Sequence, residues 1–432
     1  MPSRSGSSAL ARRAAALLLG ALATSGCGSQ GITIHASGTS VFYYEERGPS
    51  SFGVEWVEGG RETHVECRGR IVLTADDRAV ESLDGAAQLE VRTRHDGRRD
   101  SLLVRPDDGL APVVEFRVDG ELREFDAPAQ AWLADVLSTL ARRTPVFART
   151  KAERALEAGG PAAVLALLAQ TESSAARRVY LELCLEQQDL TEDDLRALVR
   201  STRERVGQNS LRVSVLEALA TRERDNEELT LALVDAAGTI ASSSSKRQVL
   251  EATARERALS TRSARALADA SKGVASSSDR AATLATLLEH GPRDREFLVA
   301  WIEALETVPS SAGRRRALEA FFELPELEQP VLVRALEAVA ALPSNSDRAR
   351  LLEPLAAELA LTGGGLDAFL AATSAISSSH SQADVLERLL ERDDLGEEEL
   401  AKILRIVERI ASSSRRERLQ KKLLERLLED AG

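Results

Sequence analysis

The sequence predicts a mainly α-helical protein, with an α-helical solenoid of about eight two-helix repeats behind a small antiparallel β domain. Three observations support this prediction. Aromatic residues make up only 3% of the chain, and Ala, Leu, Glu and Arg dominate it, which is typical of long helical structure. The C-terminal two-thirds repeats itself every 34 residues. The segment before it alternates apolar and polar residues between glycine-containing turns.

The repeat consists of columns of similar residues spaced 34 positions apart. One apolar column is Val206, Ile240, Val274, Val308, Leu342, Ile376 and Ile410. A second is Leu185, Leu219, Thr253, Leu287, Phe321, Leu355, Leu389 and Leu423. A third column is small: Ala270, Ala304, Ala338 and Ala372. A fixed period of this length indicates a stacked array of helices, and the alanines allow close packing of neighbouring helices.

A polar turn precedes the first helix of each repeat. One column there contains only Ser and Asn: Asn209, Ser243, Ser277, Ser311, Asn345, Ser379 and Ser413. Such side chains accept a hydrogen bond from an unpaired amide of the first helical turn, which stabilises a helix by about 1 kcal/mol. We therefore expect these residues to be the N-caps of the first helices.

The repeats resemble two known families of helical solenoid. Their period is similar to that of tetratricopeptide repeats, and their two-helix plan resembles HEAT repeats, over the range Pro161 to Leu428. The tetratricopeptide consensus itself is not met, because no repeat places Leu-Gly and Tyr in its first helix. The resemblance thus implies an architecture and a general ability to bind proteins or peptides. It does not identify any residue of this sequence as a binding residue.

The segment from 31 to 125 carries the signals of β structure. Its strand-like runs are 31–38, 52–60, 63–74, 88–95, 101–106 and 113–120. Asp-Gly turns at 96–97, 108–109 and 119–120 are strong hairpin signals. We expect about six strands in a small antiparallel sandwich or meander. A helix over 127–142, with Trp132, Leu133, Val136 and Leu140 on one face, is expected to close this domain.

The first residues carry an export signal. Arg12 and Arg13 precede an apolar run over 14–23, which is too short to span a bilayer and is typical of a signal peptide. The run leads into Ser25-Gly26-Cys27, which resembles the lipobox of bacterial lipoproteins, although Thr24 stands where that family usually has Leu. The resemblance implies lipidation of Cys27 and, because Gly28 follows it, an outer-membrane destination. The alternative is ordinary secretion with cleavage near Gly26.

These patterns divide the chain into four parts. We expect a signal peptide at 1–26, a lipid-anchored β-rich domain at 27–126, a connecting helix at 127–146 and the solenoid at 147–432. The two remaining cysteines, Cys67 and Cys184, fall on a strand and a helix of different parts. We expect these two thiols to be unpaired and partly buried. The alternative is that they form a disulfide in an oxidising compartment.

Charge and motifs argue against several functional classes. The net charge of −12 disfavours binding to nucleic acid, because a chain this acidic is not attracted to a phosphate backbone by charge alone. The five histidines are scattered, and the sequence contains neither an HExxH motif nor a Gly-x-Ser-x-Gly elbow. We therefore expect no catalytic residue, no metal site and no cofactor.

A basic column lies near the start of each first helix. It contains Arg178, Arg212, Lys246, Arg280, Arg314, Arg348, Gln382 and Arg416. A cation opposes the helix dipole at that place, so its recurrence needs an explanation. Eleven residues earlier lies an acidic column: Asp235, Asp269, Glu303 and Glu337. We expect a ladder of ion pairs between the two columns, and the alternative is a basic ridge for an anionic partner.

The sequence therefore predicts a non-catalytic lipoprotein of the cell envelope. Its lipid would hold it on the periplasmic side of a membrane, the outer membrane rather than the inner one, and its repeat surface would bind a protein or peptide. The alternative is an enzyme or small-ligand-binding protein whose site lies in the β domain or at its junction with the solenoid.

Overall fold

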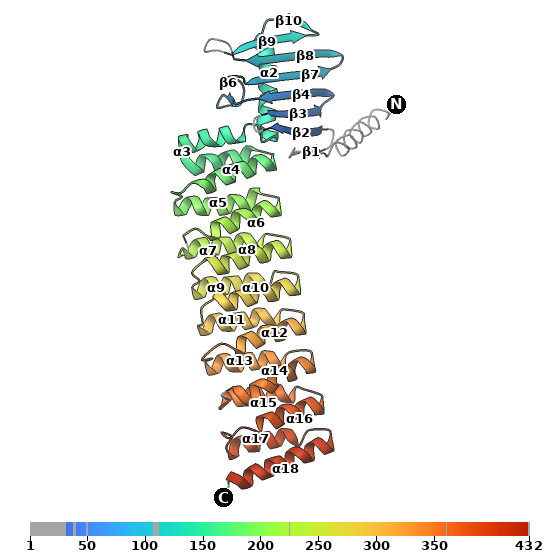
Figure 1. Ribbon diagram of the computed structural model, residues 1–432, viewed down its shortest axis with the longest axis vertical. Helices are drawn as coiled ribbons and strands as arrows, with labels where there is room; N and C mark the ends of the chain where they lie inside the picture. Colours follow the sequence, from blue (N-terminus) through green and yellow to red (C-terminus); the bar gives the residue numbers. More distant parts are fainter. Residues whose placement is uncertain are drawn as a thin grey trace, which may run out of the picture. The chain divides into compact units, whose positions relative to one another are not determined.

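The computed structural model describes residues 32–37, 40–48, 51–106, 112–223, 225–359 and 361–430. The signal peptide expected at 1–26 and the expected lipidation site Cys27 lie outside these residues. The described residues form strands β1 to β10 and helices α2 to α18 (Figure 1). None of the described helices is long and apolar enough to cross a membrane. The chain divides into two compact units, Met1–Gln187 and Gln188–Gly432, which are described separately.

The first unit contains an antiparallel sheet whose strands follow one another in chain order. These are β1 (Ile32–Ser37), β2 (Ser40–Gly48), β3 (Ser51–Glu58), β4 (Arg61–Arg68), β7 (Gln88–His95), β8 (Arg98–Arg105), β9 (Val113–Val118) and β10 (Glu121–Arg123). Strands β5 (Ile71–Leu73) and β6 (Val80–Leu83) form a separate hairpin. The structure thus selects the predicted meander over the sandwich.

Two of the predicted Asp-Gly turns join neighbouring strands. Asp96 and Gly97 connect β7 to β8, Asp119 and Gly120 connect β9 to β10, and all four residues have positive φ. This is the geometry of the tight turn that Asp-Gly favours between antiparallel strands. The third predicted turn, at 108–109, lies outside the described residues.

The strand prediction was incomplete in two places. Strand β2 was missed because its apolar run from Val41 to Tyr44 is continuous and lacks the alternation of a half-buried strand. The single run expected over 63–74 is two strands, β4 and β5, separated at Gly69. Gly69 has φ +73°, and a Cβ there would lie 2.7 Å from the Cα of Ala87, so the turn requires glycine.

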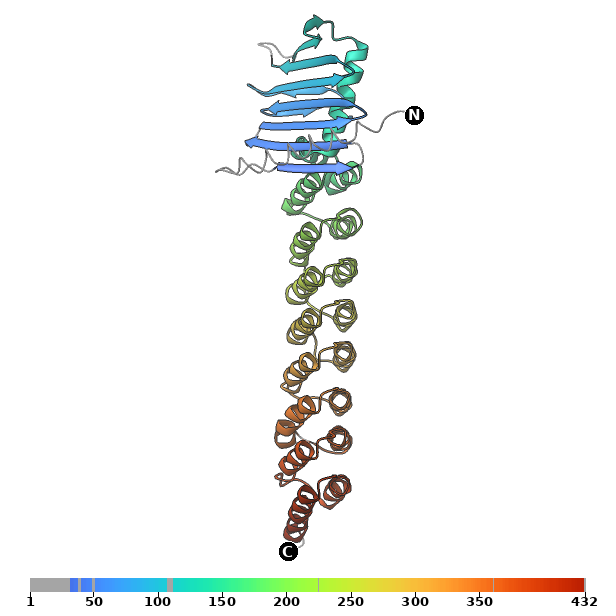
Figure 2. The same ribbon diagram turned by 90° about the vertical axis from the view of Figure 1, so that its right-hand side faces the viewer.

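Helix α2 (Ala127–Arg143) covers one face of the sheet, as predicted (Figure 2). The Asp126 side chain caps it by accepting a hydrogen bond from the amide of Ala129. Its buried residues Leu133, Val136 and Leu140 share one apolar core with the inward-facing side chains of the strands: Val54, Trp56, Val65, Cys67, Leu89, Val91, Leu102, Val104 and Phe116. Two further helices, α3 (Ala148–Gln170) and α4 (Ser174–Glu186), belong to this unit.

The second unit is an α-helical solenoid, as predicted. Its helices are α5 (Glu192–Arg205), α6 (Asn209–Ala220), α7 (Glu227–Gly238), α8 (Ser243–Glu256), α9 (Thr261–Ser271), α10 (Ser277–His290), α11 (Arg295–Glu306), α12 (Ser311–Phe322), α13 (Gln329–Ala340), α14 (Asn345–Glu358), α15 (Gly364–Ser374), α16 (Ser379–Leu389), α17 (Glu397–Val407) and α18 (Ser413–Asp430). Odd-numbered helices pack on odd-numbered ones and even on even, which gives two layers (Figure 2).

The apolar columns form the core between these two layers. Every residue of the column from Val206 to Ile410 is at most 2% exposed. Trp301 and Phe369 are fully buried and belong to this core. The indole of Trp301 stacks on Phe321 and donates a hydrogen bond of 2.7 Å to the carbonyl of Leu284.

The N-caps lie one residue earlier than predicted. The capping side chains are Ser242, Ser276, Ser310, Ser344 and Ser378, each of which accepts a hydrogen bond from the amide three residues later. Three residues of the predicted column instead connect successive repeats. Ser243 accepts from the amide of Ser276 at 3.3 Å, Asn345 accepts from the amide of Ser377 at 3.2 Å, and Ser311 donates to the carboxylate of Asp347 at 2.6 Å. The polar turn therefore holds the cap and, at these three places, a link to the next repeat.

Candidate functional site

The basic column does not form the predicted ladder of ion pairs. The predicted acids pair elsewhere: Asp235 with Arg203, Asp269 with Lys272 at 2.7 Å, and Glu337 with Arg334 at 3.7 Å. Spacing along the sequence was misleading because these acids are exposed and pair with cations on, or directly after, the odd-numbered helices.

Side chains of the basic column instead bind carbonyl groups at helix ends. Arg280 donates to the carbonyl of Val274, just beyond α9, at 3.0 Å from Nε and 2.7 Å from Nη2. Its Nη1 donates to the carbonyl of Thr307, at the end of α11, at 2.5 Å. A cation favours the negative ends of both helix dipoles and satisfies carbonyls that no helical amide reaches. Partial burial lowers the pKa of Arg280 from its usual value.

Other members of the column repeat this arrangement. Lys246 donates to the carbonyl of Gly273 at 3.0 Å, and Arg416 donates to that of Ile410 at 2.9 Å. Arg212, Arg314 and Arg348 likewise bind backbone carbonyls of neighbouring helix ends. These donors are engaged with the backbone, so the column stabilises the solenoid and is a poor candidate for the basic ridge.

Arg–Asp pairs connect some of the even-numbered helices. Arg247 of α8 lies 3.4 Å from Asp279 of α10, and Arg315 of α12 lies 3.2 Å from Asp347 of α14. Arg247 is also 3.9 Å from Glu251 on its own helix, and Arg315 makes the same pair with Glu319. A pattern of one arginine and two acids is therefore present on both sides of the α10–α12 pair.

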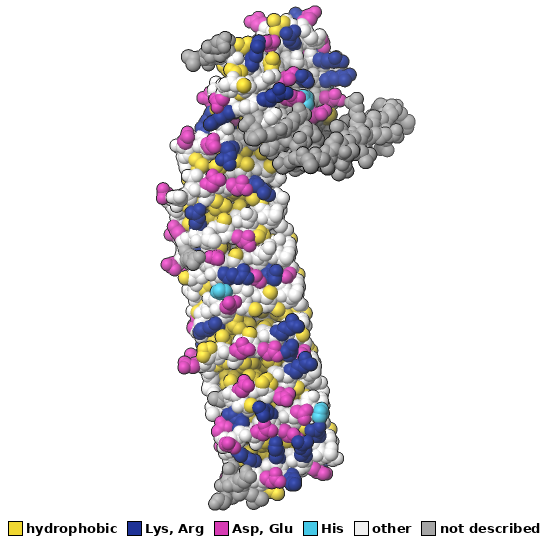
Figure 3. Space-filling model, viewed as in Figure 1, with side chains coloured by type: hydrophobic (Ala, Val, Ile, Leu, Met, Phe, Trp, Pro, Cys, Tyr) yellow, Lys and Arg dark blue, Asp and Glu magenta, His cyan; other side chains and the backbone are white. Residues whose placement is uncertain are grey.

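Between α10 and α12 this pattern is missing. Ala281, Ala285 and Gly313 stand where the repeat before has Arg247, Glu251 and Asp279. A groove of about 700 Å³ lies there, which is within the size range of ligand pockets. It is lined by Ser277, Ser278, Ala281, Ala282, Ala285, Leu288, Ser310, Ala312, Gly313, Arg316, Ala317 and Ala320. In Figure 3, exposed apolar surface alternates with charged side chains along this unit.

The groove contains one cation and no acid among its lining residues. Arg316 is exposed and makes no hydrogen bond or ion pair with any residue that the structure describes. Lining residues come from the first turns of both helices, Ser277 and Ser278 on α10 and Ala312 and Gly313 on α12. Helix N-termini carry partial positive charge and unpaired amides. Asp279 lies in the first turn of α10, and Asp347 accepts a hydrogen bond of 2.6 Å from Ser311 in the first turn of α12, so the helix starts already have acidic neighbours. The lining itself combines one arginine and three serines with an apolar floor.

The open face of the sheet in the first unit holds a second, polar depression of about 630 Å³. Glu55, His64, Arg92 and Ser101 face one another across its strands. Their neighbours neutralise several of these charges: His64 is 3.1 Å from Glu66, and Arg92 pairs with Glu90. A sheet face with internally paired charges is typical of a solvated surface.

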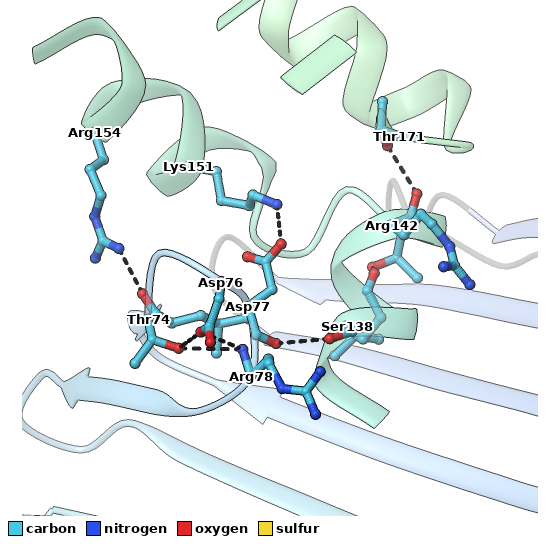
Figure 4. A network of polar contacts seen from close by, with 12 residues as sticks. Thr74, Asp76, Asp77, Arg78, Ser138, Arg142, Lys151, Arg154 and Thr171 are labelled. Carbon is cyan, nitrogen blue, oxygen red and sulfur yellow. Dashed lines mark hydrogen bonds and ion pairs between the residues drawn. The ribbon is translucent and has the colours of Figure 1, made fainter. Parts of the chain in front are cut away.

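A polar network fastens the β5–β6 hairpin to helices α2 and α3 (Figure 4). Asp77 makes an ion pair with Lys151, and its carbonyl accepts a hydrogen bond of 3.4 Å from Ser138. Arg154 donates to the carbonyl of Leu73 at 2.8 Å. The hydrogen bond from Thr74 holds the pKa of Asp76 below its usual value. The described groups of this network bind one another, which favours a structural role.

No protein-family model matches the chain, and no curated protein matches it. The fold therefore defines the class, a helical-repeat protein with an N-terminal β sheet. Within the described ranges, no group of three or more His, Cys, Asp or Glu side chains is arranged to hold a metal ion.

Proposed function

We propose that this protein is a non-catalytic envelope lipoprotein that binds a protein or peptide through its helical repeats. The short apolar run ending at Gly26-Cys27 supports export and lipid anchoring on the periplasmic side of a membrane, the outer one in preference to the inner. The two-layered stack supports binding, because solenoids expose long helical surfaces.

One observation carries the proposal more than any other. The polar pattern that links α8 to α10 and α12 to α14 is replaced between α10 and α12 by alanine and glycine, and an open groove results. Arg316 has no acidic partner there among the described residues. Exposed apolar surface beside a cation without a described partner favours recognition of a partner.

Photo-cross-linking in intact cells tests the proposal. A photoreactive amino acid is placed in turn at Ala285 of α10, Ala401 of α17 and Arg200 of α5, which are all exposed. We expect irradiation to give a protease-sensitive adduct heavier than the chain at one or more of these positions. Absence of a polypeptide adduct at all three, in a protein that is folded and in the membrane fraction, would contradict the proposal.

A further inference from the structure

Building on the proposed lipid anchor, we infer that one end of the sheet lies against the phospholipid headgroups of the membrane that holds the anchor. This is the end at which β1 begins and β4 finishes, and Arg68 and Arg70 would bind lipid phosphates there. The inference rests on the proposed function, because it requires the lipid on Cys27.

The first argument concerns the length of chain between the lipid and the sheet. Four residues separate Cys27 from Ile32, where β1 begins. These four lie outside the described residues, but an extended chain spans at most about 3.6 Å per residue, so the five steps reach at most about 18 Å. The headgroup layer on each side of a bilayer is itself about 5–8 Å thick. The start of β1 is therefore confined to the neighbourhood of the headgroups.

The second argument concerns what lies beside the start of β1. Strand pairing through β2 and β3 places Ile32 in line with Glu66, near the end of β4. Neighbouring strands are about 4.8 Å apart, so three steps across the sheet amount to about 14 Å. Strand β4 finishes at Arg68, and Arg70 follows two residues later. Both arginines thus belong to the part of the sheet that the short tether holds close to the membrane.

The third argument concerns the freedom of these two side chains. Arg68 is 63% exposed and lies 3.6 Å from Glu66, while Arg70 is 60% exposed and lies 4.0 Å from Asp84 and 3.8 Å from Glu153. These distances exceed that of a hydrogen bond, so the guanidinium donors remain free among the described residues. A guanidinium matches two phosphate oxygens at once, and cations beside a bilayer are attracted to its anionic lipids.

Exposed arginines alone would not identify this end of the sheet. Arg94 and Arg99, near the opposite ends of β7 and β8, also have no ion pair or side-chain hydrogen bond with any residue that the structure describes. The tether makes the choice, because it leaves the sheet only from the end where β1 begins. Arg94 lies six residues along β7 from Gln88, the partner of Arg68, which corresponds to about 20 Å.

Fluorescence quenching on vesicles tests the inference with the lipidated full-length chain. The vesicles contain phosphatidylethanolamine, phosphatidylglycerol and a phospholipid that carries a nitroxide quencher on its headgroup. Gln88→Cys and Arg94→Cys are each labelled with bimane, since both positions lie on the open face of β7, whereas Cys67 and Cys184 are buried and should not react. We expect quenching at position 88 to be at least about twofold stronger than at position 94, because of the 20 Å or so between them.

Matched charge variants test the role of the two arginines. Arg68→Gln combined with Arg70→Gln should reduce the quenching at position 88 about twofold, because both phosphate contacts are lost. Arg61→Gln combined with Arg99→Gln removes the same charge at exposed positions of the opposite strand ends and should leave the quenching unchanged. Thermal unfolding must show that both variants remain as stable as the unmodified chain.

Two outcomes would overturn the inference. Quenching at position 94 that equals or exceeds that at position 88 would show that the open face, or the opposite end, meets the lipid. Quenching at position 88 that Arg68→Gln with Arg70→Gln does not reduce would remove the phosphate contacts. The mass of the N-terminal peptide separates this failure from that of the proposed function. Acyl chains on Cys27 in either case leave the anchor standing and only the contact wrong, whereas their absence would reject both.

Discussion

Arg280→Gln is the most direct test of how the basic column stabilises the solenoid. Arg280 binds the carbonyl of Val274 at 2.7 Å and that of Thr307 at 2.5 Å. A hydrogen bond from a charged donor contributes about 1.5–3 kcal/mol, and both carbonyls lie near helix ends where water can replace the donor, so we take about 1 kcal/mol for each. The interaction with two helix dipoles adds about 0.3–1 kcal/mol. The variant should therefore lose about 2–3 kcal/mol of unfolding free energy.

Urea denaturation followed by circular dichroism measures this loss. Repeat arrays can unfold in parts, so hydrogen exchange should also be measured at the ends of α9 and α11, where we expect faster exchange. Arg316→Gln is the matched control on the even-numbered layer. Its guanidinium binds no described residue, so the change should cost less than about 0.5 kcal/mol.

A double-mutant cycle separates carbonyl binding from the ion-pair ladder. Asp269 pairs with Lys272, so Asp269→Asn should change stability by less than about 0.5 kcal/mol and should be additive with Arg280→Gln. A cost for Arg280→Gln below about 0.5 kcal/mol, or a clear coupling between Arg280 and Asp269, would refute the role of Arg280 at the helix ends.

Three further predictions concern anchoring, capping and burial. Cys27→Ser should move the protein out of the membrane fraction or stall its maturation, and unchanged partitioning on fractionation would contradict lipidation. Ser276→Ala should lower the free energy of unfolding by about 1 kcal/mol in urea denaturation, because Ser276 is the N-cap of α10. Ser277→Ala should lower it by less than half of that. A larger loss for Ser277→Ala would show that Ser277 is the cap, as the sequence predicted. Burial raises the pKa of the Cys67 thiol from 9.0 to about 12. The neutral thiol is favoured in the folded state, so its contribution to stability is complete below pH 9 and is lost as the pH rises toward 12. Iodoacetamide at pH 8 should therefore modify Cys67 only on unfolding, as measured by mass spectrometry, and rapid modification of the native protein would show that the thiol is accessible.

The sequence predicted the solenoid because burial in a stacked array repeats with the period of the chain. Val274 and Val308 occupy equivalent places between the same two helix layers, so both must be apolar, and the spacing between them reports the repeat directly. Two hairpins of the sheet could be predicted because Asp96-Gly97 and Asp119-Gly120 fix tight turns by local conformation alone, whereas the choice between a meander and a sandwich needed the structure.

The errors arose where the structure depends on contacts between repeats. In a run such as Ser276-Ser277-Ser278, propensity does not distinguish the cap from its neighbours, because all of them can accept the same kind of hydrogen bond. The partner of Arg280 was misjudged because charge spacing says nothing about backbone carbonyls, which every residue carries. The acceptors at Val274 and Thr307 have no sequence signal beyond the end of a helix.

The groove does leave a signal in the sequence, although its meaning requires the packing. Ala285 interrupts a series of glutamates, and Ala281 and Gly313 stand at repeat positions that hold Arg247 and Asp279 in the preceding repeat. Only the structure shows that Arg247 and Asp279 lie against each other across two helices. Once that contact is known, the two replacements by Ala281 and Gly313 can be understood as the loss of a single ion pair between α10 and α12.

Gly313→Asp tests how much stability the first turn of α12 lacks because it contains glycine instead of an acid. Glycine inside a helix costs about 1 kcal/mol relative to alanine, and loss of an acid from the first turn costs a further 0.3–1 kcal/mol or so. Asp279 and Asp347 show that an aspartate fits after such a cap. The variant should therefore be about 1 kcal/mol more stable in urea denaturation. Gly313→Ala separates the two effects, since it should gain only the part that comes from helix propensity. If Gly313→Asp is no more stable than Gly313→Ala, an acid in this turn does not complement the dipole of α12.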